Sequence, residues 1–336
     1  MSIPSKKILL IKRPSGELLT ECFKIVEESV PQPAKNEILV KTIYLSVDPY
    51  MRNRMNDARS YVAPYELNDV LEGDGIAQVI KSENPDFESG DLLTGMLPWK
   101  QYSVLSDNHR LEKIEKIRGV SDTAYLGVLG LTGLTAYFGL LEIAHPQSNE
   151  TVVISGAAGA VGSVAGQIAK IKGCRVIGIV GSADKADFIS RELGFDGAIN
   201  YSEHRNIRKP LRELCSAGVD IYFDNVGGEI SDAVIYQIND FARIVLCGQI
   251  SLYNQKRLVM GPRLLPQLII HRVKMQGFIV YDYAKRFPDA RRDLINWLQN
   301  KRLIHKEQIV DGFDKMPASL ISLFSGANTG KLIVRV

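Results

Sequence analysis

Apolar residues follow two different patterns along the chain. Between residues 151 and 281, runs rich in valine and isoleucine alternate with segments whose apolar residues recur at helical spacing. Such runs are typical of parallel strands covered on both faces, so the alternation predicts repeated strand–helix–strand units and a doubly wound sheet. The ligand crevice of such a sheet lies at the carboxyl ends of its strands. The expected strands are residues 151–155, 175–180, 197–201, 219–227, 242–248 and 274–281, and the expected helices are residues 163–173, 183–194, 207–218 and 229–240.

The flanking regions have a different pattern. From residue 1 to about 125, short alternating segments separated by turn-like stretches predict a small, mostly β domain. Residues 126–142 combine glycines with a helical apolar face, which places the boundary near them. The chain ends in a strand-like run, and we expect it to return to the first domain because chain ends need a sheet or core to hold them. We therefore predict one domain from residues 1–128 and 301–336, and an α/β domain from residues 129–300.

Three glycines follow the first strand of the α/β domain. Gly156, Gly159 and Gly162 have the spacing G-x-x-G-x-x-G and precede a helical pattern. Glycines there let the backbone approach a pyrophosphate, and the N–H groups of the first helical turn face its negative charge. A plain turn or a helix contact also uses such glycines. The strand–helix alternation that follows favours a Rossmann dinucleotide-binding domain.

The end of the second strand distinguishes between the two nicotinamide cofactors. An NAD site usually has an acidic residue there, for the ribose 2′-hydroxyl, whereas this strand ends Val180-Gly181-Ser182 with Lys185 shortly after. Ser182 and Lys185 supply a hydroxyl and a cation suited to a 2′-phosphate, so we predict NADP(H). Lys185 could instead be a solvated charge on a helix. Asp184 lies too late for the ribose and is suited to starting that helix.

Composition excludes several classes of protein. The 336 residues are 45% hydrophobic and 24% charged, as in ordinary globular proteins of two domains. The net charge of +3 is too small and too dispersed to indicate nucleic-acid binding. We find no apolar segment long enough to span a membrane and no signal-peptide pattern, so we expect a cytosolic protein without a membrane partner.

Neither the cysteines nor the histidines are spaced as metal ligands. The four cysteines form no C-x-x-C pair, so we expect reduced thiols in the core rather than disulfides or a structural zinc site. No two histidines have the H-E-x-x-H spacing. We predict no metal. The residues concerned are Cys22, Cys174, Cys215, Cys247, His109, His145, His204, His271 and His305.

Five motifs in order along the chain carry a resemblance to a known family. They are YLSVDPYMR from residue 44, AAGAVGSVAGQIAKIKGCRVIG from 157, YFDNVGG from 222, CGQISLYN from 247 and NTGKLIV from 328. Together they resemble the zinc-independent medium-chain dehydrogenase/reductases, in the branch of prostaglandin reductases, alkenal double-bond reductases and bacterial curcumin reductase-like enzymes. The resemblance runs essentially from end to end.

The resemblance implies both a fold and an activity. It implies a GroES-like catalytic domain beside the Rossmann domain, NADPH as hydride donor, and reduction of the carbon–carbon double bond of an α,β-unsaturated aldehyde or ketone. Homodimers are common in this branch. The zinc-dependent relatives carry G-H-E where this chain has Leu71-Glu72-Gly73-Asp74-Gly75. Conjugate reduction needs only hydride delivery, stabilisation of an enolate and a proton, so this departure favours it over alcohol oxidation.

The family pattern also assigns cofactor contacts, residue by residue. Phe278–Val280 could equally be core strand and Tyr201 could pack at a strand end. The implied contacts are Ala157, Ala158, Gly159 and Ala160 with the pyrophosphate; Lys185 and Tyr201 near the 2′-phosphate; Asn225 at the crevice; Cys247, Gly248, Gln249, Ile250, Ser251, Leu252 and Tyr253 along the nicotinamide half; Phe278, Ile279 and Val280 beside the carboxamide; and Asn328 from the terminal segment.

Two tyrosines are candidates for the reaction itself. Hydride transfer to the β-carbon would leave negative charge on the carbonyl oxygen, and a phenol can donate a hydrogen bond there without carrying charge. Tyr50 and Tyr253 are the candidates, beside the ribose 2′-hydroxyl of the cofactor. Either tyrosine could instead shape the pocket while solvent supplies the proton. Met51, Arg52 and Trp99 are further pocket candidates whose default role is packing.

Two other functions fit the same residues. An NADPH quinone oxidoreductase also needs no metal, and an NADPH-binding regulatory protein could keep the fold with little turnover. The sequence does not identify the physiological substrate, because the loops at residues 56–67 and 252–265 permit many shapes. An apolar edge strand of the Rossmann sheet is a reasonable surface for a dimer.

Overall fold

The computed structural model describes residues 3–106 and 109–336. The chain divides into two compact units. Unit 1 comprises the chain up to Leu126 together with Glu307–Val336, and unit 2 comprises Gly127–Lys306. No helix within the described ranges has the length and apolar character needed to cross a bilayer.

Unit 2 is built on a parallel sheet of six strands. Their order, β10-β9-β8-β11-β12-β13, and their parallel pairing confirm the predicted Rossmann-type doubly wound sheet. Because all the strands run the same way, the loops that follow them gather at one edge of the sheet. The strands are β8 (Thr151–Ser155), β9 (Arg175–Val180), β10 (Gly197–Asn200), β11 (Val219–Asp224), β12 (Ile238–Leu246) and β13 (Lys274–Gly277).

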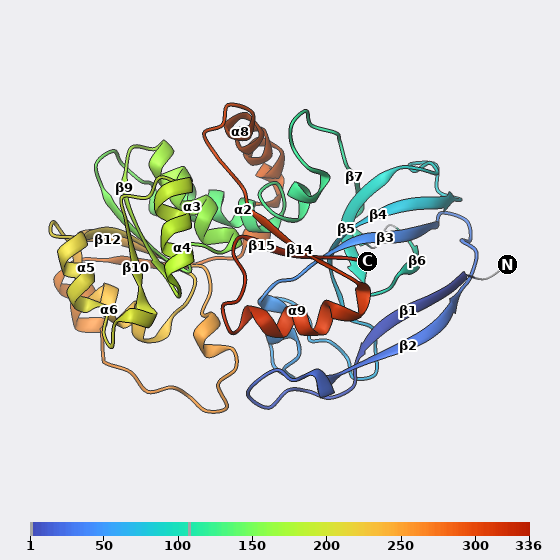
Figure 1. Ribbon diagram of the computed structural model, residues 1–336, viewed down its shortest axis with the longest axis horizontal. Helices are drawn as coiled ribbons and strands as arrows, with labels where there is room; N and C mark the ends of the chain where they lie inside the picture. The colour runs from blue at the N-terminus through green and yellow to red at the C-terminus, as the bar shows by residue number, and fades with distance from the viewer. Residues whose placement is uncertain (1–2, 107–108) are drawn as a thin grey trace. The chain divides into compact units, whose positions relative to one another are not determined.

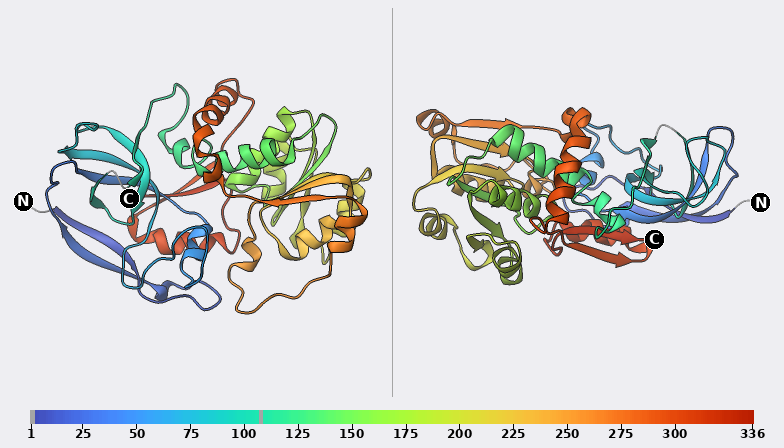
Figure 2. Two further views of the ribbon diagram at one scale, coloured as in Figure 1. Left: turned by 180° about the vertical axis from the view of Figure 1, so that it is seen from behind. Right: turned by 90° about the horizontal axis from the view of Figure 1, so that it is seen from above.

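Helices cover both faces of this sheet (Figure 2). On one face, Leu211 and Val234 pack with Ile179 and Ile244 in a fully apolar core. On the other face, Gly166 of helix α3 lies against Phe195. A Cβ added at Gly166 would lie 1.9 Å from the Phe195 ring, so α3 packs too closely for any side chain at this position. The helices of unit 2 are α2 (Leu131–Phe138), α3 (Ala160–Ile171), α4 (Ala183–Asp187), α5 (Arg208–Leu214), α6 (Gly228–Ile235), α7 (Leu265–Ile270) and α8 (Phe287–Gln299).

Several predicted elements end earlier than expected, and two of them are followed by a different element. The helix expected over residues 229–240 ends at Ile235, and β12 begins at Ile238, where it pairs with Val219. The start of β12 is strand rather than helix because Ile238 and Ala242 are buried in the apolar core beside the sheet. The strand expected over residues 274–281 ends at Gly277, and a 3₁₀ helix begins at Val280.

Unit 1 is mostly β, as predicted. Its last strand, β15, pairs antiparallel with β3, and Figure 1 shows the red β15 beside the blue β3. Trp99 and Met51 are completely buried in its core. The elements are β1 (Ile3–Leu10) and β2 (Phe23–Val30), paired with each other; the seven-stranded sheet of β3 (Ile38–Ser46), β4 (Glu72–Ser82), β5 (Leu92–Pro98), β6 (Tyr102–Leu105), β7 (Glu112–Lys113), β14 (Glu307–Asp311) and β15 (Lys331–Arg335); and the helices α1 (Tyr50–Arg54) and α9 (Met316–Leu323).

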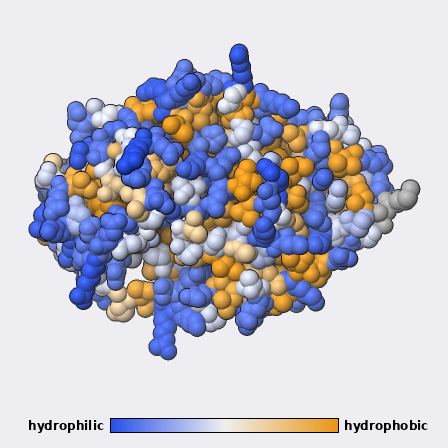
Figure 3. Space-filling view, viewed as in Figure 1, coloured by the Kyte–Doolittle hydropathy of each residue, from blue (hydrophilic) through white to orange (hydrophobic). Residues whose placement is uncertain are grey.

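Hydrophilic residues interleave with apolar ones over the face seen in Figure 3. Between residues 258 and 270 of unit 2, several large apolar side chains are more than half exposed. These are Leu258 (89%), Met260 (79%), Leu265 (70%), Ile269 (76%) and Ile270 (57%). An exposed apolar stretch of this kind is a usual mark of an interaction surface.

Candidate functional site

The glycine turn joins β8 to α3 in unit 2. Gly156 has φ +61°, and a Cβ at Gly162 would lie 2.4 Å from the carbonyl oxygen of Gly156. Only glycine therefore permits this close return of the helix onto the turn. The helix begins after Gly159, which makes no side-chain cap. This arrangement fits a pyrophosphate held by backbone N–H groups. Ala157 and Ala158 are buried, whereas Gly159 and Ala160 are partly exposed.

The carboxyl ends of β9 and β10 lie side by side and carry the residues predicted for a 2′-phosphate. A Cβ at Gly181 would lie 2.5 Å from the Tyr201 hydroxyl, so Tyr201 crosses directly over this glycine. The Ser182 hydroxyl caps α4 by accepting from the Lys185 amide. Burial lowers the pKa of the Lys185 ammonium, which marks a cation held partly out of water. Asp184 lies exposed in the first turn of α4.

Asn225 follows β11 and is tied to the end of β8. Its amide Nδ2 donates to the Ser155 carbonyl at 2.8 Å, and its backbone N–H donates to the Ser155 hydroxyl at 2.9 Å. The predicted cofactor residue therefore sits next to the glycine turn, because Ser155 immediately precedes Gly156. These bonds fix Asn225 at the edge where a Rossmann crevice opens.

The loop after β12 is bonded to the loop after β11. The amides of Cys247 and Gly248 donate to the backbone carbonyl of Asp224, and the Ser251 hydroxyl donates to that of Val226 at 2.7 Å. Ile250 and Leu252 lie in one 3₁₀ turn of this loop. The Tyr253 hydroxyl accepts from the Gln249 amide at 3.2 Å, which closes the loop on itself. All the residues predicted in Cys247–Tyr253 therefore belong to one cross-bonded loop.

Phe278, Ile279 and Val280 follow the edge strand β13. Phe278 packs against α2, since a Cβ at Gly139 would lie 2.7 Å from its ring. Val280 is buried and begins a 3₁₀ helix, while Ile279 is partly exposed. For Phe278, the structure therefore gives direct support to a packing role.

In unit 1, Tyr50 begins the short helix α1 directly after Pro49. It is partly buried and packs on the core of the unit. Met51, Arg52 and Trp99 are buried, in agreement with their default packing role. Arg52 donates to the Gly16 carbonyl at 2.8 Å, so its guanidinium fixes a distant loop.

Two buried charged groups hold the segment that bears Tyr50. Before it, Asp48 accepts from the Ser46 hydroxyl and from the ammonium of Lys331. The side chains of Asp48 and Lys331 are 10% and 4% exposed, so this ion pair is withdrawn from water. After it, Arg54 donates to Glu72 at 2.9 Å and stacks on the ring of Tyr65 at 4.0 Å.

Lys331 also connects Tyr50 with Asn328. It follows the turn in which Asn328 Nδ2 donates to the Gly330 carbonyl at 2.9 Å. The Asp48–Lys331 pair therefore ties two of the sequence motifs together across 283 residues. Tyr50 and Asn328 belong to unit 1, whereas Tyr253 and the other predicted cofactor residues belong to unit 2.

Asp74 is a third charged group near this pair. β3 and β4 pair at Leu45 and Gly75, so Asp74 lies beside the end of β3 that leads to Asp48. Burial raises the pKa of the Asp74 carboxyl to about 7, and the neighbouring charge of Asp48 adds to the shift. Lys331 and Arg110 act in the opposite direction.

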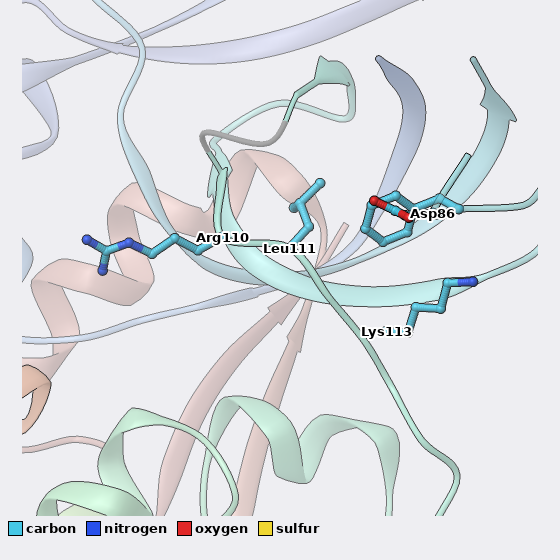
Figure 4. Close-up of a pocket in the computed structure, with 5 residues that line it drawn as sticks. Asp86, Arg110, Leu111 and Lys113 are labelled. Atoms are coloured by element: carbon cyan, nitrogen blue, oxygen red, sulfur yellow. The ribbon is translucent and has the colours of Figure 1, made fainter. Parts of the chain in front are cut away.

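A separate hollow in unit 1 contains none of the predicted residues. Its volume is about 430 Å³, and in Figure 4 Arg110 extends to one side of it while Asp86 and Lys113 lie on the other. Leu111 and Phe87 complete the lining. The Lys113 ammonium lies 5.8 Å from the centre of the Phe87 ring and pairs with Asp91, so its charge is already engaged.

Sequence reasoning missed three residues that hold the site: Asp224, Asp48 and Lys331. Each had a visible signal, because each is a charged residue inside or beside an apolar strand pattern. Among residues 3–106 and 109–336, no group of three or more histidine, cysteine, aspartate or glutamate side chains is arranged to hold a metal ion.

Family models match both parts of the chain. Residues 6–114 match the N-terminal domain of oxidoreductases, and residues 160–300 match a model described as zinc-binding dehydrogenase. Together these models cover most of the chain.

Relatives match over nearly the full length. The chain is 49% identical over 338 residues to the Bacillus subtilis protein YfmJ, described in general terms as an NADP-dependent oxidoreductase whose assignment is provisional; the match covers 100% of this chain and 99% of that one. It is 39% identical to the NADP-dependent 2-alkenal reductase of Nicotiana tabacum, over 93% of this chain and 90% of the relative. The solved structure of CurA with NADPH from Vibrio vulnificus superposes with a TM-score of 0.94 at 40% identity, covering 98% and 99% of the two chains.

Replacement of Lys331 by methionine should destabilise the protein. Lys331→Met leaves the Asp48 carboxylate buried without its cation, which typically costs about 3–5 kcal/mol. Denaturant unfolding of Lys331→Met, Asp48→Asn and the double variant measures the coupling. The double variant should be more stable than Lys331→Met alone, because it removes the unpaired charge. Lys12→Met, at an exposed pair with Glu21, should change stability by less than about 1 kcal/mol. Additive effects in the double variant would contradict a coupled pair.

Replacement of Asp74 by asparagine should stabilise the protein at high pH. The folded chain holds the Asp74 proton more tightly than the unfolded chain does, so this stabilising contribution is lost as pH rises from about 4 through about 7. The free energy of unfolding of Asp74→Asn should exceed that of the wild type at pH 8, and the difference should narrow toward pH 4. Denaturant titrations at several pH values measure it, with the exposed Asp86→Asn as control. A difference independent of pH would show that the Asp74 carboxyl does not titrate in this range.

Proposed function

Because the chain belongs to the medium-chain dehydrogenase/reductase superfamily, in the branch of prostaglandin, alkenal and curcumin reductases, and is an NADP-dependent oxidoreductase, we propose that it reduces the carbon–carbon double bond of α,β-unsaturated aldehydes and ketones. The observation that carries the proposal is the setting of Tyr50. Along the chain, Tyr50 is flanked by Asp48, which pairs with Lys331, and by Arg54, which pairs with Glu72; these pairs hold its short helix.

The proposed cofactor contacts follow the strand ends of unit 2. The glycine turn and the first turn of α3 would hold the pyrophosphate. Lys185, Ser182 and Tyr201 would receive the 2′-phosphate, where an NAD site would have a carboxylate. Asn225 and the Cys247–Tyr253 loop would line the nicotinamide half, and Asn328 would reach the cofactor from the terminal segment.

When bound, NADPH supplies the hydride for the β-carbon of the substrate. The residues of the chain then have to stabilise the negative charge that develops on the carbonyl oxygen. We assign this hydrogen bond to Tyr50, because ion pairs on both sides of it in the chain hold its segment. The Tyr253 hydroxyl accepts from the Gln249 backbone N–H within its own loop and keeps its O–H as the second candidate donor. Solvent can protonate the α-carbon, so the proposal requires no further acid.

Assays with a medium-chain enal or enone test the proposal. The protein should oxidise NADPH and release the saturated carbonyl compound. Lys185→Ala should raise KM for NADPH by about 10- to 100-fold, the usual loss for a hydrogen bond to a charged group, and leave KM for NADH unchanged. Lys172→Ala, an exposed lysine at the far end of α3, is the matched control and should leave both values unchanged.

The other outcomes point to other functions. Rapid reduction of a quinone without reduction of any enone would replace the proposal with a quinone oxidoreductase. Tight NADPH binding without turnover of either substrate would indicate a regulatory protein. Equal loss of NADPH and NADH use in Lys185→Ala would remove Lys185 from the phosphate site.

We also propose that the protein is a homodimer that pairs through unit 2. The support is the edge strand β13, whose outer side pairs with no strand among the described residues, together with the exposed apolar side chains of α7, which shortly precedes it in the chain. Ile269 and Leu265 are 76% and 70% exposed on α7.

An acidic substitution on α7 should therefore separate the subunits. Ile269→Asp places a charge in the proposed interface and should shift the protein from dimer to monomer in sedimentation experiments. Leu19→Asp, which changes an apolar residue of unit 1 that is 49% exposed, should leave the dimer intact. A wild-type monomer, or a dimer unaffected by Ile269→Asp, would refute this interface.

A further inference from the structure

Asp224 is a buried carboxylate at the carboxyl end of β11. It is 1% exposed, and both of its oxygens accept several hydrogen bonds. The donors to Oδ1 are Ser155 Oγ at 3.0 Å, Tyr222 Oη at 2.8 Å, Val226 N at 3.0 Å and Gly227 N at 2.9 Å; the donors to Oδ2 are Ser231 Oγ at 2.6 Å and Gln249 Nε2 at 2.9 Å.

None of these donors is a cation. Hydroxyl, amide and backbone N–H groups stabilise a carboxylate, but they do not cancel its charge. Asp224 therefore differs from Asp48, which lies against the ammonium of Lys331. A buried charge without a counter-ion acts over a longer distance than a charge in water, because the interior screens it weakly.

The charge lies among the segments proposed to hold the nicotinamide half of the cofactor. Asn225 is its neighbour in the chain, Gln249 is one of its donors, and its own carbonyl oxygen accepts from Cys247 N and Gly248 N. The Cys247 thiol responds to this setting: burial raises its pKa to about 12, and the Asp224 charge adds to the shift. The negative potential thus reaches the loop after β12.

We propose that Asp224 tunes the bound cofactor electrostatically, favouring the oxidised nicotinamide over the reduced one. The oxidised ring carries a positive charge and the reduced ring is neutral, so a nearby carboxylate stabilises NADP⁺ more than NADPH. The inference rests on the proposed function for the place of the nicotinamide. Its consequence is a bound cofactor that gives up hydride more readily.

The ratio of two dissociation constants tests this role without any turnover. The Kd values for NADP⁺ and NADPH are measured by calorimetry or fluorescence for the wild type and for Asp224→Asn. In the variant, Kd for NADP⁺ should rise roughly three- to tenfold more than Kd for NADPH, as a lost charge interaction at a separation of several ångströms predicts. A tenfold change in this ratio corresponds to about 30 mV in the potential of the bound two-electron couple.

Three further variants separate charge from structure. Ser231→Lys keeps Asp224 but brings an ammonium group to its Oδ2, so it should shift the ratio in the same direction, and it serves if Asp224→Asn does not fold. Ser231→Ala removes a hydrogen bond and leaves the charge, so it should not shift the ratio. Asp220→Asn makes the same charge change earlier on β11, where Asp220 accepts from Thr151 and Asn239, and should also leave the ratio unchanged.

The outcomes are distinct from those of the reductase assays. Equal weakening of NADP⁺ and NADPH binding in Asp224→Asn would show a purely structural role and overturn the inference. An equal shift in Asp220→Asn would also overturn it. If the wild type binds both nucleotides but reduces no enone, the proposed function fails, while the ratio still decides the role of Asp224.

Discussion

A buried polar group must find hydrogen-bond partners, and this rule organises the nucleotide side of the molecule. The parallel sheet brings the ends of β8, β11 and β12 to one edge, but it does not fix the loops that follow them. Asp224 connects them, because its two oxygens accept hydrogen bonds from Ser155, Gly227 and Gln249, one from each of these three strand ends or loops. Ser155 precedes the glycine turn, Gly227 follows Asn225, and Gln249 lies within the loop of residues 247–253. The loops at this edge are thus held in place by one carboxylate as well as by the glycines.

The need for partners also holds for the buried charged side chains of unit 1. Asp48 and Lys331 are both withdrawn from water, so each charge requires the other as its partner. Arg54, Tyr65 and Glu72 form a second such group, in which the Tyr65 hydroxyl donates to the Glu72 carbonyl at 2.6 Å. Tyr50 lies between Asp48 and Arg54 in the chain, so both groups hold its backbone. A site held this way loses little conformational entropy when a substrate arrives.

Local patterns predicted the Rossmann sheet and its glycine turn, because each buried strand and the turn from Gly156 to Gly162 depend on residues that are consecutive in the chain. They failed where long-range contacts decide. Ile238 has a helical pattern behind it, yet its pairing with Val219 makes it strand. Asp224 and Lys331 also have partners that are far away in the chain. The sequence alone therefore showed that each is a charged residue in an apolar pattern, but not which residues it contacts. The roles of Asn225 and Asn328 came from family motifs, that of Lys185 also from the missing acid after the second strand, and all three stay predictions.

The pairing of Asp48 with Lys331 also bears on how the protein is made. The two residues are 283 positions apart, and Lys331 begins the last strand, β15. During synthesis the rest of unit 1 leaves the ribosome long before its last strand does. Until β15 is made, the edge of β3 that pairs with it is open and Asp48 lacks Lys331. Unit 2 is contiguous and can fold in that interval. Unit 2 thus matures first, and the Tyr50 segment is fixed only after β15 has been made.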